Sequence, residues 1–261
     1  MRPRPLQDTS RRADPLPDLQ NRPAQRPEAA LGSETPGQAG VVRMRLLKID
    51  MHVHTLYSPD CRTGLEEILE AMDKKGLDMV AVLDHNTIEG GLKLREMAPG
   101  RVIVGEEIRT SEGEVAGLFI EETIPPGLSP EETVERIKSQ GGLVYITHPF
   151  DPFRREVLRR EALYRIEPLI DAIEGFNARN LLKRSNRKAL RFAAERSIPV
   201  GAGSDAHTRF EIGRGYVLIE PFQGPQDFLI KLKSARIGGR KVSPLFNLFT
   251  KLYKTAKGVG R

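Results

Sequence analysis

The 261-residue chain contains no tryptophan, one cysteine and no apolar run close to the roughly 18 residues that span a bilayer. A single cysteine, Cys61, cannot form an intramolecular disulfide, and the beginning of the chain lacks the apolar core of a signal peptide. We therefore expect no transmembrane segment, and a reducing cytoplasm is the simplest location. The length is sufficient for one large α/β domain with its own core.

Charge is distributed unevenly along the chain, whose net charge is +6. Residues 1–45 carry eight arginines against five acidic residues, and the stretch from Lys231 onward carries nine lysines or arginines and no acid. The residues between these two stretches are therefore acidic overall. An acidic body suits a site that concentrates cations, so the basic balance of the whole chain does not indicate a nucleic-acid surface across the fold.

The two ends of the chain differ from the middle. Residues 1–45 hold seven prolines and no apolar periodicity, which predicts disorder, although translation could instead begin at Met44. Residues 237–261 are expected to form a basic tail with an amphipathic helix. This helix could pack on the barrel or bind a membrane surface or nucleic acid, and we favour packing. Its apolar positions are Leu245, Leu248, Phe249, Leu252, Tyr253 and Ala256.

Residues 46–236 alternate between short apolar runs and amphipathic stretches. Strands separated by helices of about ten to fifteen residues indicate parallel pairing through right-handed crossovers. About seven such units predict a closed, somewhat irregular α/β barrel. The expected strands are 46–50, 78–84, 101–108, 114–120, 143–147, 171–177, 199–204 and 216–219, and the expected helices are 65–75, 89–97, 130–140, 155–166, 183–196 and 225–235.

Every histidine lies in or directly after one of the expected strands. Strand ends meet at one mouth of a barrel, and imidazole is the commonest protein metal ligand. His52 and His54 share one side of an extended chain because side chains alternate, and Asp50 is expected to point the same way and orient a histidine. The five are His52, His54, His85, His148 and His207.

Carboxylates accompany these histidines, and no thiolate does. One histidine at a strand end is more often a core or surface residue, but five of them together with several carboxylates favour a polynuclear metal centre. Imidazole and carboxylate ligands favour zinc, manganese or iron in a hydrolytic site. Arg109 and Arg179 could clamp a phosphate or be surface residues, and Asn177 could bind substrate or cap a helix.

These motifs, in this order, resemble those of the PHP (polymerase and histidinol phosphatase) superfamily from about residue 46 to 220, and the stretch after residue 170 resembles the PHP-associated C-terminal region. The motifs are Asp50-x-His52-x-His54-Thr55 with Ser58-x-Asp60, Asp84-His85-Asn-Thr, Gly105-x-Glu107-Ile, Thr147-His148-Pro, Glu174-x-x-Asn177-x-Arg179 and Gly203-Ser-Asp205-Ala-His207.

The resemblance implies a distorted (β/α)7 TIM-like barrel, residues 46–236, with two or three divalent ions: zinc, manganese or iron, with magnesium as an alternative. Glu114 stands where many members have a histidine, so the second metal could be carboxylate-bound, weak or absent. The implied ligand sets are His52, His54, Glu107 and Asp205 for the first metal, Glu107 and His148 for the second, and Asp60, His85 and His207 for the third.

The resemblance also implies a metal-dependent phosphoesterase, in which a metal-bridging hydroxide attacks phosphorus. We expect Asp205 to take part in catalysis and His148 or His207 to protonate the leaving oxygen. The expected substrate is a nucleotide, a short oligonucleotide or a small phosphometabolite, and the oligomeric state is left open. A catalytically silent scaffold is the main alternative, and a nuclease using the basic tail is a third.

Overall fold

The computed structural model describes residues 45–242, which all lie in one compact unit. The expected disordered segment before residue 45 and the expected amphipathic helix after Pro244 lie outside the described residues. The strands are β1 Leu47–Val53, β2 Met79–His85, β3 Val102–Thr110, β4 Gly113–Leu118, β5 Leu143–Ile146, β6 Ala172–Asn177, β7 Val200–Gly203, β8 Gly215–Ile219 and β9 Arg236–Gly239. The helices are α1 Leu65–Lys75, α2 Glu89–Met97, α3 Pro130–Ser139, α4 Arg160–Ile166, the 3-10 turn η1 Glu167–Leu169, α5 Lys183–Arg196 and α6 Gly224–Leu232.

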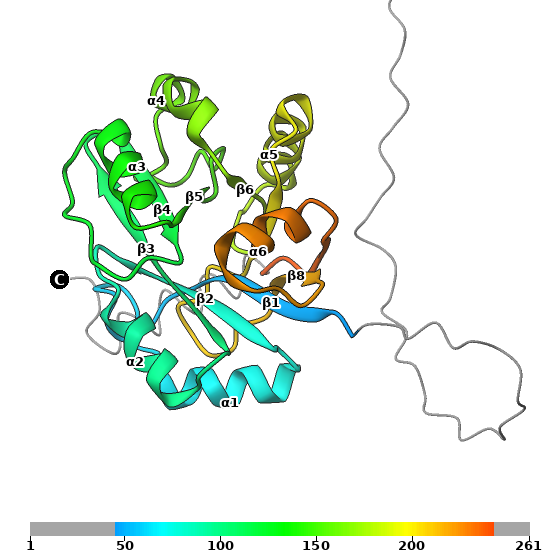
Figure 1. Cartoon of the computed structure of the whole chain (residues 1–261). Helices are drawn as coiled ribbons and strands as arrows, with labels where there is room; N and C mark the ends of the chain where they lie inside the picture. The colour runs from blue at the N-terminus through cyan, green and yellow to red at the C-terminus, as the bar shows by residue number, and fades with distance from the viewer. Residues whose placement is uncertain (1–44, 243–261) are drawn as a thin grey trace, which may run out of the picture. The chain divides into compact units, whose positions relative to one another are not determined.

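The strands form one sheet in the order β7-β6-β5-β4-β3-β2-β1-β8-β9 (Figure 1). The sheet curls until the residues after β7 meet β1. There the Asp205 amide donates to the His52 carbonyl at 2.7 Å, and the His54 amide donates to the Ala206 carbonyl at 3.0 Å. This nearly closed sheet confirms the predicted α/β barrel.

The parallel pairing expected from the strand–helix alternation does not hold throughout, however. The pairs β3–β4, β4–β5, β1–β8 and β8–β9 are antiparallel. Only two residues separate β3 from β4, too few for the crossover that parallel strands need, so these strands form a hairpin. β9 was not expected, and it extends the sheet to Gly239, beyond the boundary placed at residue 236.

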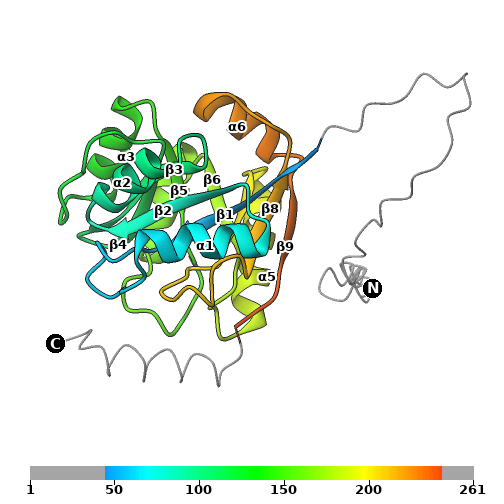
Figure 2. The same ribbon diagram turned by 90° about the horizontal axis from the view of Figure 1, so that it is seen from below.

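Two apolar clusters hold the barrel together. Ile49, Met51 and Leu83 belong to a cluster inside the barrel, which Phe228 of α6 joins. The outer cluster packs α1 to α5 against the sheet and includes Met72 of α1 (Figure 2). Because side chains alternate along a strand, each strand feeds both clusters. In residues 45–242 no helix is both long enough and apolar enough to cross a membrane.

The helix expected over 155–166 begins only at Arg160. The residues before it form a loop, here called the 149–159 loop, whose backbone pairs with β4 and its turn. The Glu114 amide donates to the Glu156 carbonyl at 2.7 Å, and the Arg159 amide donates to the Glu112 carbonyl at 2.8 Å. These bonds use backbone groups that the missing helical turn would need.

Candidate metal centre

A β-bulge in β1 aims the first two histidines at the site. Register shifts between Asp50 and Val53, so that His52 and His54 face the centre although Met51 faces the interior cluster. The expectation that Asp50 orients a histidine ring was therefore wrong. Its carboxylate accepts from the backbone amides of His52, Ser204 and Gly213 at 3.2, 2.8 and 2.7 Å. Burial raises the pKa of Asp50 to about 6, against the lowering effect of these hydrogen bonds.

The four residues of the first expected ligand set meet in a fully buried cluster. The Nε2 atoms of His52 and His54 lie 3.1 Å apart. Oε2 of Glu107 lies 3.4 Å from Nε2 of His52, and Oδ1 of Asp205 lies 3.6 Å from Nε2 of His54. Two imidazole nitrogens that face each other so closely need a shared proton or a shared cation between them.

Glu107 also links this cluster to the second set. Its Oε1 lies 3.0 Å from Nε2 of His148 and accepts a hydrogen bond from Thr147 Oγ1 at 2.6 Å. Glu114, the departure from the family pattern, lies with its Oε1 3.2 Å from Nδ1 of His85. His85, Glu107 and Glu114 thus form a group whose ligand atoms all lie within 4.8 Å of one another.

The third set lies nearest the solvent. Oδ2 of Asp60 is 2.6 Å from Nε2 of His207, and Oδ1 of Asp60 is 3.9 Å from Nε2 of His85. The ring of His54 lies between those of His85 and His207, with centroid distances of 4.8 and 4.4 Å. The structure therefore brings together all nine residues expected as metal ligands.

Glu174 supports the centre from behind, a role that sequence reasoning did not assign. His52 Nδ1 donates to Oε1 of Glu174 at 3.1 Å, and the His148 amide donates to Oε2 at 2.8 Å. Asn177 does not cap α5, whose N-cap is Leu182. The Asn177 amide group instead donates to Glu174 at 2.9 Å and to Asp205 at 3.1 Å, so it holds two carboxylates in place.

Neighbouring residues in the sequence face away from the centre. Asp84 accepts from the amide and hydroxyl of Thr55, both at 2.6 Å, and Glu106 accepts from the Ile124 amide at 2.9 Å. Cys61 is buried, and its thiol donates to backbone carbonyls at the site. These residues shape the walls and do not supply ligand atoms.

A cavity of about 940 Å³ opens over the centre, and Asp60, His85 and His207 are among its lining residues. Arg109 and Arg179, both expected as substrate contacts, also line it. Arg179 contacts Nδ1 of His207 and donates to the Asp205 carbonyl at 3.3 Å.

Sequence reasoning missed a third arginine of this cavity, Arg154, which forms an ion pair with Asp205. It lies just before the helix that was expected from residue 155. The sequence signal that could have indicated this contact is the Arg154-Arg155 pair, which begins six residues after the expected ligand His148.

Charges in the centre are strongly coupled. Burial alone would lower the pKa of His52, but the carboxylates of Glu174 and Glu107 hold that pKa well above its ordinary value. Burial alone would raise the pKa of Asp205, but Arg154 and His52 hold it well below its usual range. The pKa of His54 falls to about 4 through burial.

The donor set fits divalent metal ions. Several buried ligand atoms in the described part of the chain have no hydrogen-bond partner, which is costly unless a cation satisfies them. His148 and Asp205 also adopt left-handed backbone conformations, with φ of 30° and 56°, a strain found mainly at functional sites. The unpartnered atoms are His54 Nδ1, Glu107 Oε2, His148 Nδ1 and Nε2, and Asp205 Oδ1.

Comparison with known proteins identifies relatives by sequence. The family of PHP-associated domains matches residues 183–237. One uncharacterized protein of Methanocaldococcus jannaschii is 35% identical over 197 residues, which is 72% of this chain and 79% of that protein. Another from the same organism is 41% identical over 145 residues, which is 51% of this chain and 82% of that protein.

Solved structures share the fold at low sequence identity. PsfC from Pseudomonas syringae is 20% identical with a TM-score of 0.62, covering 82% of this chain and 99% of that one. A two-domain protein from Bacteroides vulgatus, described as containing a predicted PHP-like metal-dependent phosphoesterase, is 18% identical with a TM-score of 0.61, covering 80% and 70%. A lesion-specific endonuclease from Pyrococcus furiosus is 18% identical with a TM-score of 0.55, covering 74% and 57%. Residues 183–237 thus match the PHP-associated family, and the chain shares the fold of these PHP-like structures.

Proposed function

We propose that this protein is a metal-dependent phosphoesterase. The observation that carries the proposal is the convergence of four overlapping ligand groups, with unpartnered buried donor atoms, at the floor of one arginine-lined cavity. Bound there, two or three divalent ions would activate water and neutralise phosphoryl charge. Zinc, manganese or iron suits the imidazole and carboxylate donors, with magnesium as the oxygen-preferring alternative.

The chain's own residues would bind and orient the phosphate. Arg154 and Arg179 lie next to Asp205, and Arg109 lines the same cavity, so guanidinium groups can approach the phosphoryl oxygens as bidentate donors. His207 lines the cavity, whereas His148 is completely buried, so of these two expected proton donors only His207 could reach a leaving oxygen, in a protein where His207 does not hold the third ion. Asn177 would keep Asp205 oriented.

The cavity suits a phosphomonoester or phosphodiester of a nucleotide, an oligonucleotide or a small phosphometabolite. Its volume lies in the range of small-molecule sites. Only forty residues separate Glu107 from His148, which leaves no room for an inserted lid domain, so the site is open enough for the end of a chain. The structural similarity to the lesion-specific endonuclease from Pyrococcus furiosus supports an oligonucleotide as one of these substrates.

The test is activity after metal loading. Protein reconstituted with manganese, zinc or iron should hydrolyse generic phosphomonoesters or phosphodiesters, and Asp205→Ala and His52→Ala should each lower the rate by several orders of magnitude with the circular dichroism spectrum retained. The competing scaffold function predicts no hydrolysis. Elemental analysis that finds no metal bound after reconstitution would favour the scaffold.

A further inference from the structure

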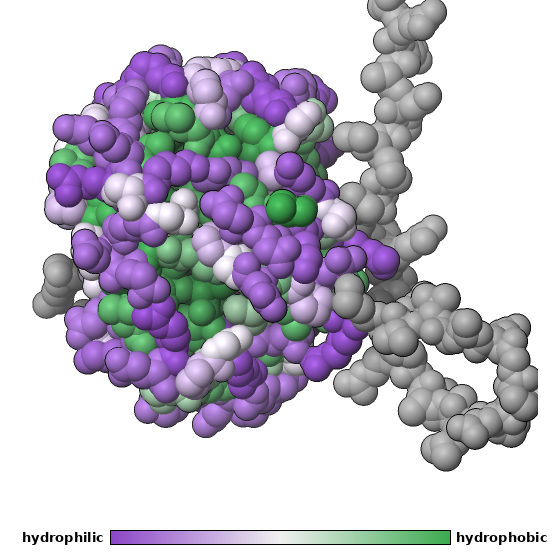
Figure 3. Space-filling view, in the orientation of Figure 1, coloured by the Kyte–Doolittle hydropathy of each residue, from purple (hydrophilic) through white to green (hydrophobic). Residues whose placement is uncertain are grey.

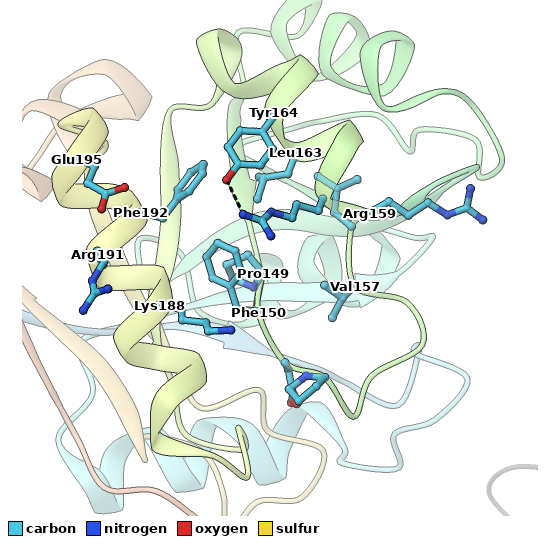
Figure 4. Close-up of a pocket in the computed structure, with 14 residues that line it drawn as sticks. Pro149, Phe150, Val157, Arg159, Leu163, Tyr164, Lys188, Arg191, Phe192 and Glu195 are labelled. Atoms are coloured by element: carbon cyan, nitrogen blue, oxygen red, sulfur yellow. Dashed lines mark hydrogen bonds between the residues drawn. The ribbon is translucent and has the colours of Figure 1, made fainter.

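A second cavity, of about 660 Å³, lies between the 149–159 loop and helices α4 and α5 (Figure 4). Its apolar wall includes Phe150, Leu163 and Phe192, of which Leu163 and Phe192 belong to the buried core. Tyr164 adds an aromatic ring that is 42% exposed. Figure 3 shows hydrophobic surface between the positions of α4 and α5, bordered by hydrophilic surface. The contact area for a ligand ring is thus supplied by Phe150 and Tyr164, with Leu163 and Phe192 packed behind them.

Basic side chains line the same cavity. Figure 4 shows Lys188 extending from α5 toward Phe150. Arg160 donates a hydrogen bond to the Tyr164 hydroxyl at 3.3 Å, which keeps its guanidinium beside that ring. Within residues 45–242, Lys188 has no carboxylate partner at ion-pair distance, and the lining acid Glu195 pairs with Arg196 at 3.1 Å. The other lining acid, Asp151, is buried and lies 3.5 Å from Arg154.

The cavity is separate from the candidate metal centre. The 149–159 loop forms a wall of both cavities, and only Asp151 lines both. Phe150 and Leu158 face the second cavity, whereas Arg154 lines the cavity over the metal centre.

We propose that this second cavity binds an aromatic phosphate, with the ring against Phe150 and Tyr164 and the phosphate beside Lys188. Aromatic side chains stack on planar rings, and an unpaired ammonium attracts a phosphate. The volume suits a ligand of nucleotide size. Charge argues against the chain's own ends as occupants, since both the segment before residue 45 and the segment after residue 242 are basic. The binding does not depend on the proposed phosphoesterase activity.

The experiment is calorimetric titration of the full-length protein in EDTA with adenosine monophosphate, adenosine and inorganic phosphate. EDTA prevents hydrolysis and metal-mediated binding at the other cavity. The monophosphate should bind saturably, and both fragments should bind much more weakly, because each presents only half of the recognised chemistry. Titration with phenyl phosphate tests which class of aromatic phosphate the cavity recognises. If phenyl phosphate binds more weakly than the nucleotide, the site is assigned to nucleotides. If the two bind equally, the site is assigned to aryl phosphates in general.

Variants locate the binding. Lys188→Glu should weaken it about tenfold or more, since a charge-assisted contact is replaced by repulsion. Tyr164→Ala should weaken it through loss of the ring contact. Arg187→Glu is the matched control, because it makes the same charge change on an exposed neighbour in α5 that does not line the cavity. Thermal unfolding of each variant checks that the fold is retained.

Arg179→Ala removes a cation of the other cavity and should leave the affinity unchanged. Binding that survives Lys188→Glu but is lost in Arg179→Ala would place the ligand at the metal centre and overturn the proposal. Inorganic phosphate binding as tightly as the nucleotide would overturn it as well, because the aromatic wall would then contribute nothing.

Discussion

Glu174 and His52 form a fully buried pair in which the His52 Nδ1 proton is donated to a Glu174 oxygen at 3.1 Å. A hydrogen bond at Nδ1 leaves Nε2, the atom that faces His54, as the nitrogen available to a metal. The second oxygen of Glu174 accepts from the His148 amide, so one carboxylate on β6 positions ligands from both β1 and the end of β5.

We expect Glu174→Gln to lower metal affinity by about 10- to 100-fold, the usual effect of losing a carboxylate that orients a ligating histidine. Isothermal titration with zinc or manganese measures the change. Glu161→Gln, an exposed position on α4, makes the same substitution away from the centre and should bind metal as the wild type does. Equal affinities in the two variants would show that His52 does not need this partner.

The close approach of β7 to β1 predicts that Gly203→Ala disrupts the centre. A Cβ at position 203 would clash with the Cβ of His52 and lie 2.8 Å from Oε1 of Glu174. His52 must then move, so metal content after reconstitution should fall. The nearest atom to an added Cβ at Gly64 is 3.7 Å away, which makes Gly64→Ala the control that should keep its metal. Full metal content in Gly203→Ala, measured by elemental analysis, would contradict this geometry.

Much of the fold followed from local pattern. Alternation along β2 and β3 places His85 and Glu107 on the side of the interior residues Leu83 and Ile103, so strand-end ligands were predictable from spacing. The same reasoning failed at Asp50, because one bulge changes which residues face inward and no local signal marks it.

Long-range pairing accounts for the other errors. Residues 155–159 of the loop were predicted as the start of a helix because their sequence permits one, but the loop backbone bonds to β4 and its turn, which are distant in the sequence. The contact of Arg154 with Asp205 depends on that loop. Local propensity contains no information on such partners.

Cys61 should be an unreactive thiol in the folded protein. Burial raises its pKa from an ordinary value of 9.0 to about 11, so the neutral form predominates at neutral pH. Labelling with a disulfide reagent should be slow at pH 8 and rapid after unfolding in urea. The folded state holds this proton more tightly than the unfolded state, so the contribution to stability is complete below about pH 9 and is lost as the pH rises toward 11. Rapid stoichiometric labelling of the folded protein at pH 8 would refute this assignment.

Removing metal should destabilise the protein. Without a cation, Glu107 Oε2 and Asp205 Oδ1 remain buried without hydrogen bonds. A ligand at about 100 times its dissociation constant adds roughly 2.7 kcal/mol to the free energy of unfolding, which for a domain of this size is roughly 5 to 10 °C in melting temperature. Scanning calorimetry with and without EDTA measures the shift, and restoring zinc or manganese should reverse it. A melting temperature that changes neither on adding EDTA nor on restoring zinc or manganese would mean that the cluster binds no metal.

The resemblance implies a histidine at the position of Glu114, and we expect the charge of Glu114 to affect the binding of one ion only. Its Oε1 lies 3.2 Å from Nδ1 of His85, within the group that also contains Glu107. Burial and the neighbouring Glu107 raise the pKa of Glu114. A cation bound between them would offset the repulsion between the two carboxylates.

Glu114→Gln keeps the size of the side chain but removes its charge. We expect metal content to fall by about one ion per chain, while the ions held by His52, His54 and Asp205 remain. Glu161→Gln, at an exposed position on α4 that does not line this cavity, is the control that should keep the wild-type content. Unchanged metal content in Glu114→Gln would show that His148 and Glu107 hold the second ion without it.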